Sequence, residues 1–114
     1  MKSFFRDLFV YNYHFNQKLA KLFNENSGKI SGKSISLFSH TLNAHQIWNN
    51  RIEPKQPLYK VWDTHPVESF EKIDAANYEH SLIILDKFEL DVKIDYSPVR
   101  GKVLTMALRA YYFT

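Results

Sequence analysis

The sequence predicts an all-α fold, an up-and-down helical bundle of three long helices and the start of a fourth, with a short β-hairpin insertion. Three observations predict it. Apolar residues recur at helical spacing in three stretches, helix-breaking residues separate those stretches, and the period changes to alternation after residue 90. With 114 residues and 45% hydrophobic content, the chain can bury one modest core, so we expect a single domain over residues 1–114.

The first helix is predicted over Ser3 to Asn24, because apolar side chains recur there every three or four residues and Ser3 can cap its start. We expect this stripe to face a core. Asn12 and Asn16 lie one turn apart beside it, and buried amides of this kind more often bond to neighbouring helices than to a substrate. The stripe consists of Phe4, Leu8, Phe15, Leu19 and Leu22, flanked by Phe5, Phe9 and Phe23.

The second helix is predicted over Ser34 to Ile52, after a polar connecting segment that contains two glycines. Its apolar stripe, which we also expect to face the core, is formed by Leu37, Thr41, Ala44, Trp48 and Ile52, with Phe38 and Leu42 widening it on one side and Ile47 on the other. His45 projects near the middle of this stripe, and His40 projects toward its edge. The geometry therefore favours His45 as the more buried histidine.

The third helix is predicted over Pro66 to Phe88, because proline is tolerated in the first turn of a helix. An irregular crossover, in which Trp62 packs back on the bundle, leads to it from Pro54 and Pro57, which end the second helix. We expect the three helices to run antiparallel. The stripe of the third helix consists of Phe70, Ile73, Asn77, Ser81, Ile84 and Phe88.

The two histidines of this region have ordinary interpretations. His65 stands at the helix start and is expected to be exposed. His80 lies on the margin of the third stripe, and a solvated or locally bonded ring is the more common role there. The position one turn later, Ile84, carries no metal-ligand side chain that could act with His80.

The end of the chain changes its pattern. Val92, Ile94 and Tyr96 alternate with polar residues, which predicts a hairpin near Ile94 to Leu104. We expect Thr105 to Thr114 to form the opening turns of a fourth helix.

Composition excludes several function classes. The chain has no cysteine, so disulfides, thiolate metal sites and a cysteine nucleophile are excluded. Its net charge of +3 comes from scattered lysines and arginines, so we expect no nucleic-acid partner. No uninterrupted apolar stretch approaches the roughly 20 residues of a spanning helix, and charges interrupt the first residues. We therefore expect a cytoplasmic protein with no membrane partner.

Three segments resemble the DinB family of bacterial four-helix-bundle proteins: Ser39 to Trp48, Tyr11 to Asn16 and Trp62 to Pro66. The resemblance covers most of the chain. It implies a divalent metal, zinc or nickel, held by three histidines, and His40 matches the first of them. It also implies a metal-dependent transferase or hydrolase that acts on a thiol or small-molecule substrate. The family's second and third ligands form a His-x-x-x-His pair after the hairpin, and this sequence contains no such pair.

The remaining histidines do not replace that pair. His40 and His45 are five residues apart, so their side chains diverge by about 140° around the helix and cannot readily chelate one ion. A catalytic zinc needs about three protein ligands. We therefore expect His40, and less so His45, as metal-ligand candidates in a chain that holds no divalent metal tightly. We interpret the domain as C-terminally incomplete, either a truncated family member or one that completes its core with a partner.

Three functions remain open: a DinB-like metal-dependent transferase or hydrolase, a non-catalytic helical module that forms a homodimer, and a remnant without selected activity. No phosphate-binding loop, nucleophile elbow or His-Glu-x-x-His motif is present, and the serines near His40 suit helix capping better than nucleophilic catalysis. A homodimer would cover the face that a complete fourth helix covers, where Phe15, Trp48 and Phe70 are candidates. The sequence names no substrate and no catalytic residue.

Overall fold

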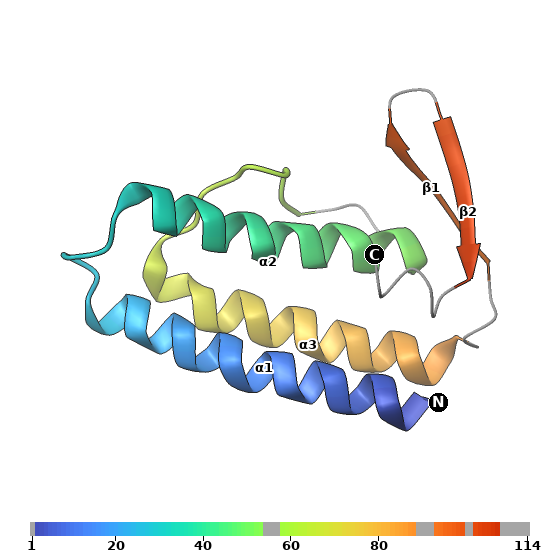
Figure 1. The fold of residues 1–114 in the computed structure, drawn as a ribbon, viewed down its shortest axis with the longest axis horizontal. Helices are drawn as coiled ribbons and strands as arrows, with labels where there is room; N and C mark the ends of the chain where they lie inside the picture. Colours follow the sequence, from blue (N-terminus) through green and yellow to red (C-terminus); the bar gives the residue numbers. More distant parts are fainter. Residues whose placement is uncertain (1, 54–57, 89–92, 100–101, 108–114) are drawn as a thin grey trace.

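Three long helices pack side by side in Figure 1, which confirms the all-α part of the prediction. The computed structural model describes residues 2–53, 58–88, 93–99 and 102–107. Its elements are α1 (Lys2–Glu25), α2 (Gly32–Ile52), a short 3₁₀ helix η1 (Val67–Ser69), α3 (Phe70–Lys87), β1 (Lys93–Val99) and β2 (Lys102–Ala107). None of the described helices is long and apolar enough to span a membrane.

Helix α3 runs parallel to α2, so the prediction of antiparallel, up-and-down helices is wrong for this pair (Figure 1). Near their starts, the rings of Phe38 and Phe70 lie 4.8 Å apart. Near their ends, Lys87 Nζ lies 2.8 Å from Glu53 Oε2. The reason is the connection between them: it returns along the length of α2, so α3 begins at the end of the bundle where α2 also begins.

Helix α1 is antiparallel to α3 and packs along it. Arg6 near the start of α1 forms a salt bridge of 2.6 Å with Asp86 near the end of α3. Midway along both helices, the rings of Tyr13 and Tyr78 stack with their centroids 4.2 Å apart. Helix α3 therefore contacts both other helices, while a groove separates α1 from α2 along part of their length.

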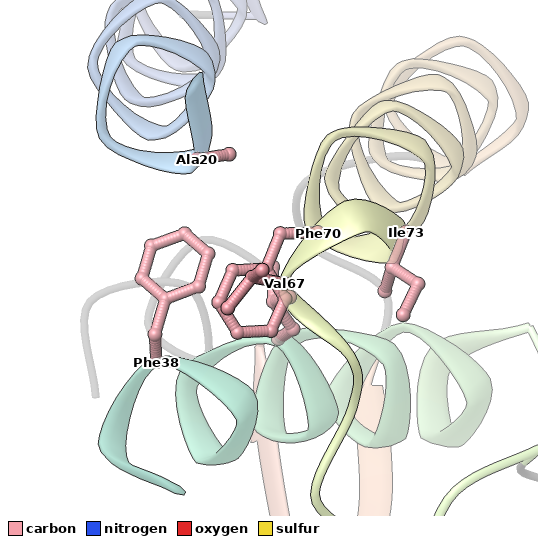
Figure 2. Close-up of a cluster of buried hydrophobic side chains, with 6 residues drawn as sticks. Ala20, Phe38, Val67, Phe70 and Ile73 are labelled. Atoms are coloured by element: carbon pink, nitrogen blue, oxygen red, sulfur yellow. The ribbon is translucent and has the colours of Figure 1, made fainter. Parts of the chain in front are cut away.

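One cluster of the hydrophobic core lies at the end of the bundle where α1 joins α2 and where α3 begins (Figure 2), while Phe5, Ile52, Ile84 and Leu85 are buried toward the other end. Phe38 of α2 and Phe70 of α3 are its central rings, and the side chain of Phe23 packs against both. Full burial of a phenylalanine side chain stabilises the fold by about 1.5–3 kcal/mol. The buried members of this cluster are Ala20, Phe38, Leu42, Val67, Phe70 and Ile73.

A two-stranded antiparallel sheet follows the helices over the residues where the sequence predicts a hairpin. Tyr96 pairs with Leu104 and Lys93 with Ala107, and the register shifts between Tyr96 and Val99. Strand β2 includes residues 105–107, where the sequence predicts the fourth helix to begin, so that start is wrong. Val103 and Thr105 are β-branched and alternate with other residues, so the pattern typical of a strand continues past Leu104. The rest of the predicted fourth helix, residues 108–114, lies outside the described residues.

Candidate functional site

The apolar stripe of α1 faces outward, which contradicts the prediction that it faces a core. The five stripe residues are 38–55% exposed, whereas their neighbours Phe5 and Ala20 are buried. Adjacent residues of a helix are about 100° apart, so α1 is apolar over an arc that one neighbouring helix cannot cover. Helix α3 covers the half that contains Phe5 and Ala20. The exposed half is defined by Phe4, Leu8, Tyr11, Phe15, Leu19 and Leu22, and we call it the α1 seam.

Helix α2 is rotated from the predicted orientation: it buries Phe38 and Leu42, at one edge of the predicted arc, together with several polar residues. Leu37 is 50% and Trp48 is 36% exposed, and Thr41 is also exposed, so most of the predicted stripe does not face the core. Of that stripe, Ile52 alone is fully buried. The buried polar residues of α2 are Ser39, Asn43, Gln46, Asn49 and Asn50.

Side-chain amides explain how α2 buries polar groups against α3. Asn49 Nδ2 donates to Ser81 Oγ at 3.0 Å and to the Asn77 carbonyl at 3.3 Å. Asn77 Nδ2 donates to the Leu42 carbonyl at 3.1 Å. A buried polar group without a partner costs about 1–3 kcal/mol, so these hydrogen bonds favour the observed register of the two helices. Asn49 Oδ1 and Gln46 Oε1 are buried without a partner among the described residues. The buried positions of Asn77 and Ser81 confirm the predicted stripe of the third helix.

His45 lies in the interior between the three helices. Its Nε2 lies 2.7 Å from Ser81 Oγ, and its ring stacks on Phe9 with centroids 6.1 Å apart. Burial, with a smaller contribution from His80, lowers the pKa of His45 from 6.5 to about 4. The imidazole is therefore neutral near pH 7, and one of its nitrogens is already engaged by Ser81.

His40 of α2 lies at the wall of the groove between α1 and α2, and its ring contacts the crossover that connects α2 to α3. Its Nδ1 lies 3.0 Å from the Val61 carbonyl, which can only accept, so Nδ1 carries a hydrogen and donates it. The ring stacks on Trp62 with centroids 4.0 Å apart, which agrees with the prediction that Trp62 packs back on the bundle. In the neutral ring, Nε2 is then the acceptor, and it makes no hydrogen bond to a described residue.

The groove between α1 and α2 encloses a cavity of about 480 Å³. Both candidate histidines line it, and so do Asn12 and Asn16 of α1. Such a volume lies within the usual range of small-molecule pockets. Aromatic rings and amides dominate its lining, which consists of Phe9, Asn12, Asn16, His40, Thr41, Ala44, His45, Trp48 and Asn49.

A buried carboxylate, which the sequence analysis did not identify, lies between α1 and α3. Asp74 Oδ1 accepts from Asn16 Nδ2 at 2.9 Å, and Oδ2 accepts from Gln17 Nε2 at 3.0 Å. Burial raises the pKa of Asp74, although both hydrogen bonds act in the opposite direction. Its spacing four residues after Phe70 and three before Asn77 is the signal that could have placed it inside. Asn16 therefore has the structural role expected for it, because its amide bonds to a neighbouring helix.

His65 is buried, so the prediction that it is exposed is wrong. Its backbone N–H donates to Ser39 Oγ at 3.1 Å, and its Nε2 lies 2.6 Å from Asn43 Oδ1. These bonds turn the segment before η1 inward. His80 is neither solvated nor locally bonded, because its Nε2 lies 3.0 Å from Oε1 of the buried Glu53 at the end of α2.

The described residues do not fit a divalent metal. Among them, no three His, Cys, Asp or Glu side chains are grouped so that they could hold one ion. His40 and His45 line the same groove, but Ser81 engages Nε2 of His45. His40 alone offers one nitrogen, which is fewer than the three protein ligands of a catalytic zinc site.

Comparisons with known proteins assign neither a family nor a function to this chain. No known protein family, no curated protein and no solved structure matches the chain. The geometry therefore establishes a small protein of three packed helices, with a groove between α1 and α2 as its candidate site.

Proposed function

We propose that this chain is a non-catalytic helical module that associates with a second copy through the outward apolar sides of α1 and α2. The α1 seam carries the proposal, because its six large apolar side chains are between 38% and 62% exposed. Contiguous exposed apolar patches larger than a few hundred Å² are uncommon on monomers and tend to mark interfaces.

Helix α2 extends this surface across the groove. Leu37 and Trp48 stand on its outward side and are 50% and 36% exposed. A four-helix bundle would place a further helix between α1 and α2, opposite α3, and a helix of the second copy can take that position. Twofold association is the usual solution for such a surface, since the same patch on two copies covers itself.

The energetics permit a stable dimer without guaranteeing a tight one. Burial of about 800 Å² of apolar surface contributes on the order of 20 kcal/mol at about 25 cal/mol per Å². Lost translational and rotational freedom costs about 4–15 kcal/mol, and ordering of side chains costs more. A net affinity in the micromolar range is the expectation.

Sedimentation of a charged variant tests the proposal. Phe15→Glu places a charge in the middle of the α1 seam, where the side chain is 47% exposed, so the helices should still fold. The matched control is Ile83→Glu, which makes the same kind of change at a 53% exposed position of α3. We expect the wild type and the control to dimerise at micromolar concentration and Phe15→Glu to remain a folded monomer. A well-folded monomeric wild type that binds no apolar dye would contradict the proposal.

A second candidate is the DinB-like function, a divalent-metal-dependent transferase or hydrolase, and the orientation of His40 favours it. A carbonyl that fixes Nδ1–H and leaves Nε2 as the acceptor is the arrangement by which proteins orient metal-binding histidines. In this candidate, His40 supplies one ligand at the groove, and the other ligands come from outside the described residues. No reaction step follows from one ligand, and His45 is the weaker ligand candidate.

Metal titration tests this candidate separately. We expect far less than one zinc or nickel per chain after dialysis against a chelator. We also expect weak Ni²⁺ binding that broadens NMR signals around the groove and disappears in His40→Ala. The exposed His14 provides a control, since His14→Ala should leave the groove effect unchanged. Broadening that persists in His40→Ala would exclude His40 as a ligand, and tightly retained metal would require ligands such as His45 or His80.

A further inference from the structure

We infer that the two copies pair through α1 in antiparallel orientation, around a twofold axis close to Tyr13, with Asp7 of each chain facing Lys18 of the partner subunit. This inference rests on the proposed self-association and adds the partner element, its direction and its register. It depends on two features of α1, namely the spacing of the seam and the positions of its charges.

The seam reads almost the same in both directions along the helix. Its residues are separated by intervals of three and four, which is the pattern of a helix-pairing seam. If Tyr11 is placed opposite the partner subunit's Phe15, Leu8 falls within one residue of the partner subunit's Leu19. The same register brings Phe4 opposite the partner subunit's Leu22. One antiparallel register therefore matches all six exposed side chains in three pairs, each repeated by symmetry.

Two exposed charges lie along one edge of the seam. Asp7 stands four residues before Tyr11 and Lys18 stands seven residues after it, so all three share one side of the helix. Neither Asp7 nor Lys18 forms an ion pair or hydrogen bond within the described residues. In an antiparallel pair related by a twofold axis, the same edge of each helix faces its copy. Asp7 then meets the partner subunit's Lys18 twice in the dimer.

A parallel pair would not form these contacts. In a parallel twofold pair, the charged edge of each helix lies beside the opposite edge of its partner, where Asn12 and Leu19 carry no charge. Asp7 and Lys18 would then face no opposite charge, whereas the antiparallel pair matches them. Complementary edges of this kind fix direction and register.

Cysteine cross-linking measures the register directly, because the natural chain contains no cysteine. Leu8→Cys is mixed with a size-tagged Leu19→Cys variant and oxidised mildly. We expect the mixed disulfide between positions 8 and 19 to exceed either homodisulfide at least fivefold. Ile83→Cys, exposed on α3, is the background control and should cross-link no more than a monomer does.

Charge reversal provides an independent measurement that does not alter the apolar contacts. Asp7→Lys or Lys18→Asp alone should weaken the dimer about tenfold, because each change turns two attractive pairs into repulsive ones. The double reversal should return the dissociation constant to within about twofold of the wild type. In a parallel dimer, neither single change would weaken the association in this way, because neither residue would face a charge of the partner.

The outcomes separate this inference from the proposed function. Absence of any wild-type dimer overturns both. A wild-type dimer in which homodisulfides predominate, or in which the double reversal does not rescue the single changes, overturns the antiparallel register and leaves self-association standing. Leu8→Cys and Leu19→Cys are both mild changes at exposed positions, so circular dichroism should show that both variants are folded.

Discussion

His65 Nε2 donates a hydrogen bond of 2.6 Å to Asn43 Oδ1, and this contact joins the crossover to the buried side of α2. The donor assignment follows from Asn43, whose Nδ2 already donates to the carbonyls of Val61 and Asp63 at 3.3 and 2.8 Å. One amide therefore fixes the crossover at three points. The same segment holds Val61, whose carbonyl also orients His40.

Asn43→Ala should destabilise the protein by about 3 kcal/mol, because it removes three hydrogen bonds and leaves buried groups of the crossover unsatisfied. Urea unfolding measures the change. Asn12→Ala, at an exposed position of α1, is the control and should change the free energy of unfolding by less than about 0.5 kcal/mol. NMR signals of Val61 and His40 should shift in the first variant. Equal stability of the two variants would show that the crossover is held by other contacts.

Acid should destabilise the protein through its buried histidines, although the raised pKa of Asp74 acts in the opposite direction as pH falls. The pKa of His45 is lowered from 6.5 to about 4 in the folded chain, so between these values the unfolded chain binds a proton that the folded chain does not. Stability is therefore lost as pH falls from 6.5 toward 4, by about 3 kcal/mol at 1.36 kcal/mol per pKa unit. Burial also lowers the pKa of His65, which acts in the same direction.

Urea unfolding at a series of pH values tests the contribution of His45. His45→Gln keeps a polar group near Ser81 and cannot bind a proton, so its free energy of unfolding should fall less steeply below pH 6.5. His14→Gln, on the exposed side of α1, should follow the wild type. A profile for His45→Gln that matches the wild type would mean that His45 does not titrate with unfolding.

Trp48→Glu should leave the protein folded and weaken its association, because this side chain is 36% exposed at the groove. Phe70→Ala provides the contrast, since Phe70 is fully buried in the core and truncation of such a ring costs about 3–5 kcal/mol. Circular dichroism and sedimentation distinguish the two effects. Loss of helical signal in Trp48→Glu at neutral pH would place Trp48 in the essential core.

His40 should be observed as the tautomer with hydrogen on Nδ1, because that nitrogen donates to the Val61 carbonyl. Nitrogen-15 chemical shifts of the imidazole above its titration range report the tautomer directly. Trp62→Ala removes the stacked ring and should increase the population of the other tautomer, whereas Leu58→Ala, at a 76% exposed position, should not. A wild-type ring that is mainly protonated on Nε2 would remove the support for His40 as a metal ligand.

The helices themselves could be predicted from the sequence because their signals are local. Periodic apolar residues, two prolines and polar connecting segments place three helices within a few residues of where they lie, and the stripe of α3 is buried as predicted. The resemblance drew attention to His40, which does line the groove. No sequence pattern completes a metal site around it.

The orientation of each helix depended on its neighbours. Helix α1 is apolar on two adjacent sides, as in the pairs Leu19 with Ala20 and Leu22 with Phe23, so periodicity alone could not select the inward one. For α2, the rule that apolar residues face inward holds for Phe38 and Leu42 but fails for Leu37 and Trp48, which are exposed. Its amides become favourable inside only because Asn77 and Ser81 of α3 supply partners at hydrogen-bonding distance.

The sequence by itself determined where the helices lie, since helix formation depends on residues within one or two turns of each other. Only the tertiary structure decided that α3 runs parallel to α2, that His65 is buried, and that the α1 seam, Leu37 and Trp48 face outward. The physical reason is that burial is a property of pairs of surfaces. A polar side chain is stable inside when a distant residue satisfies its hydrogen bonds, and an apolar stripe stays exposed when no described helix covers it.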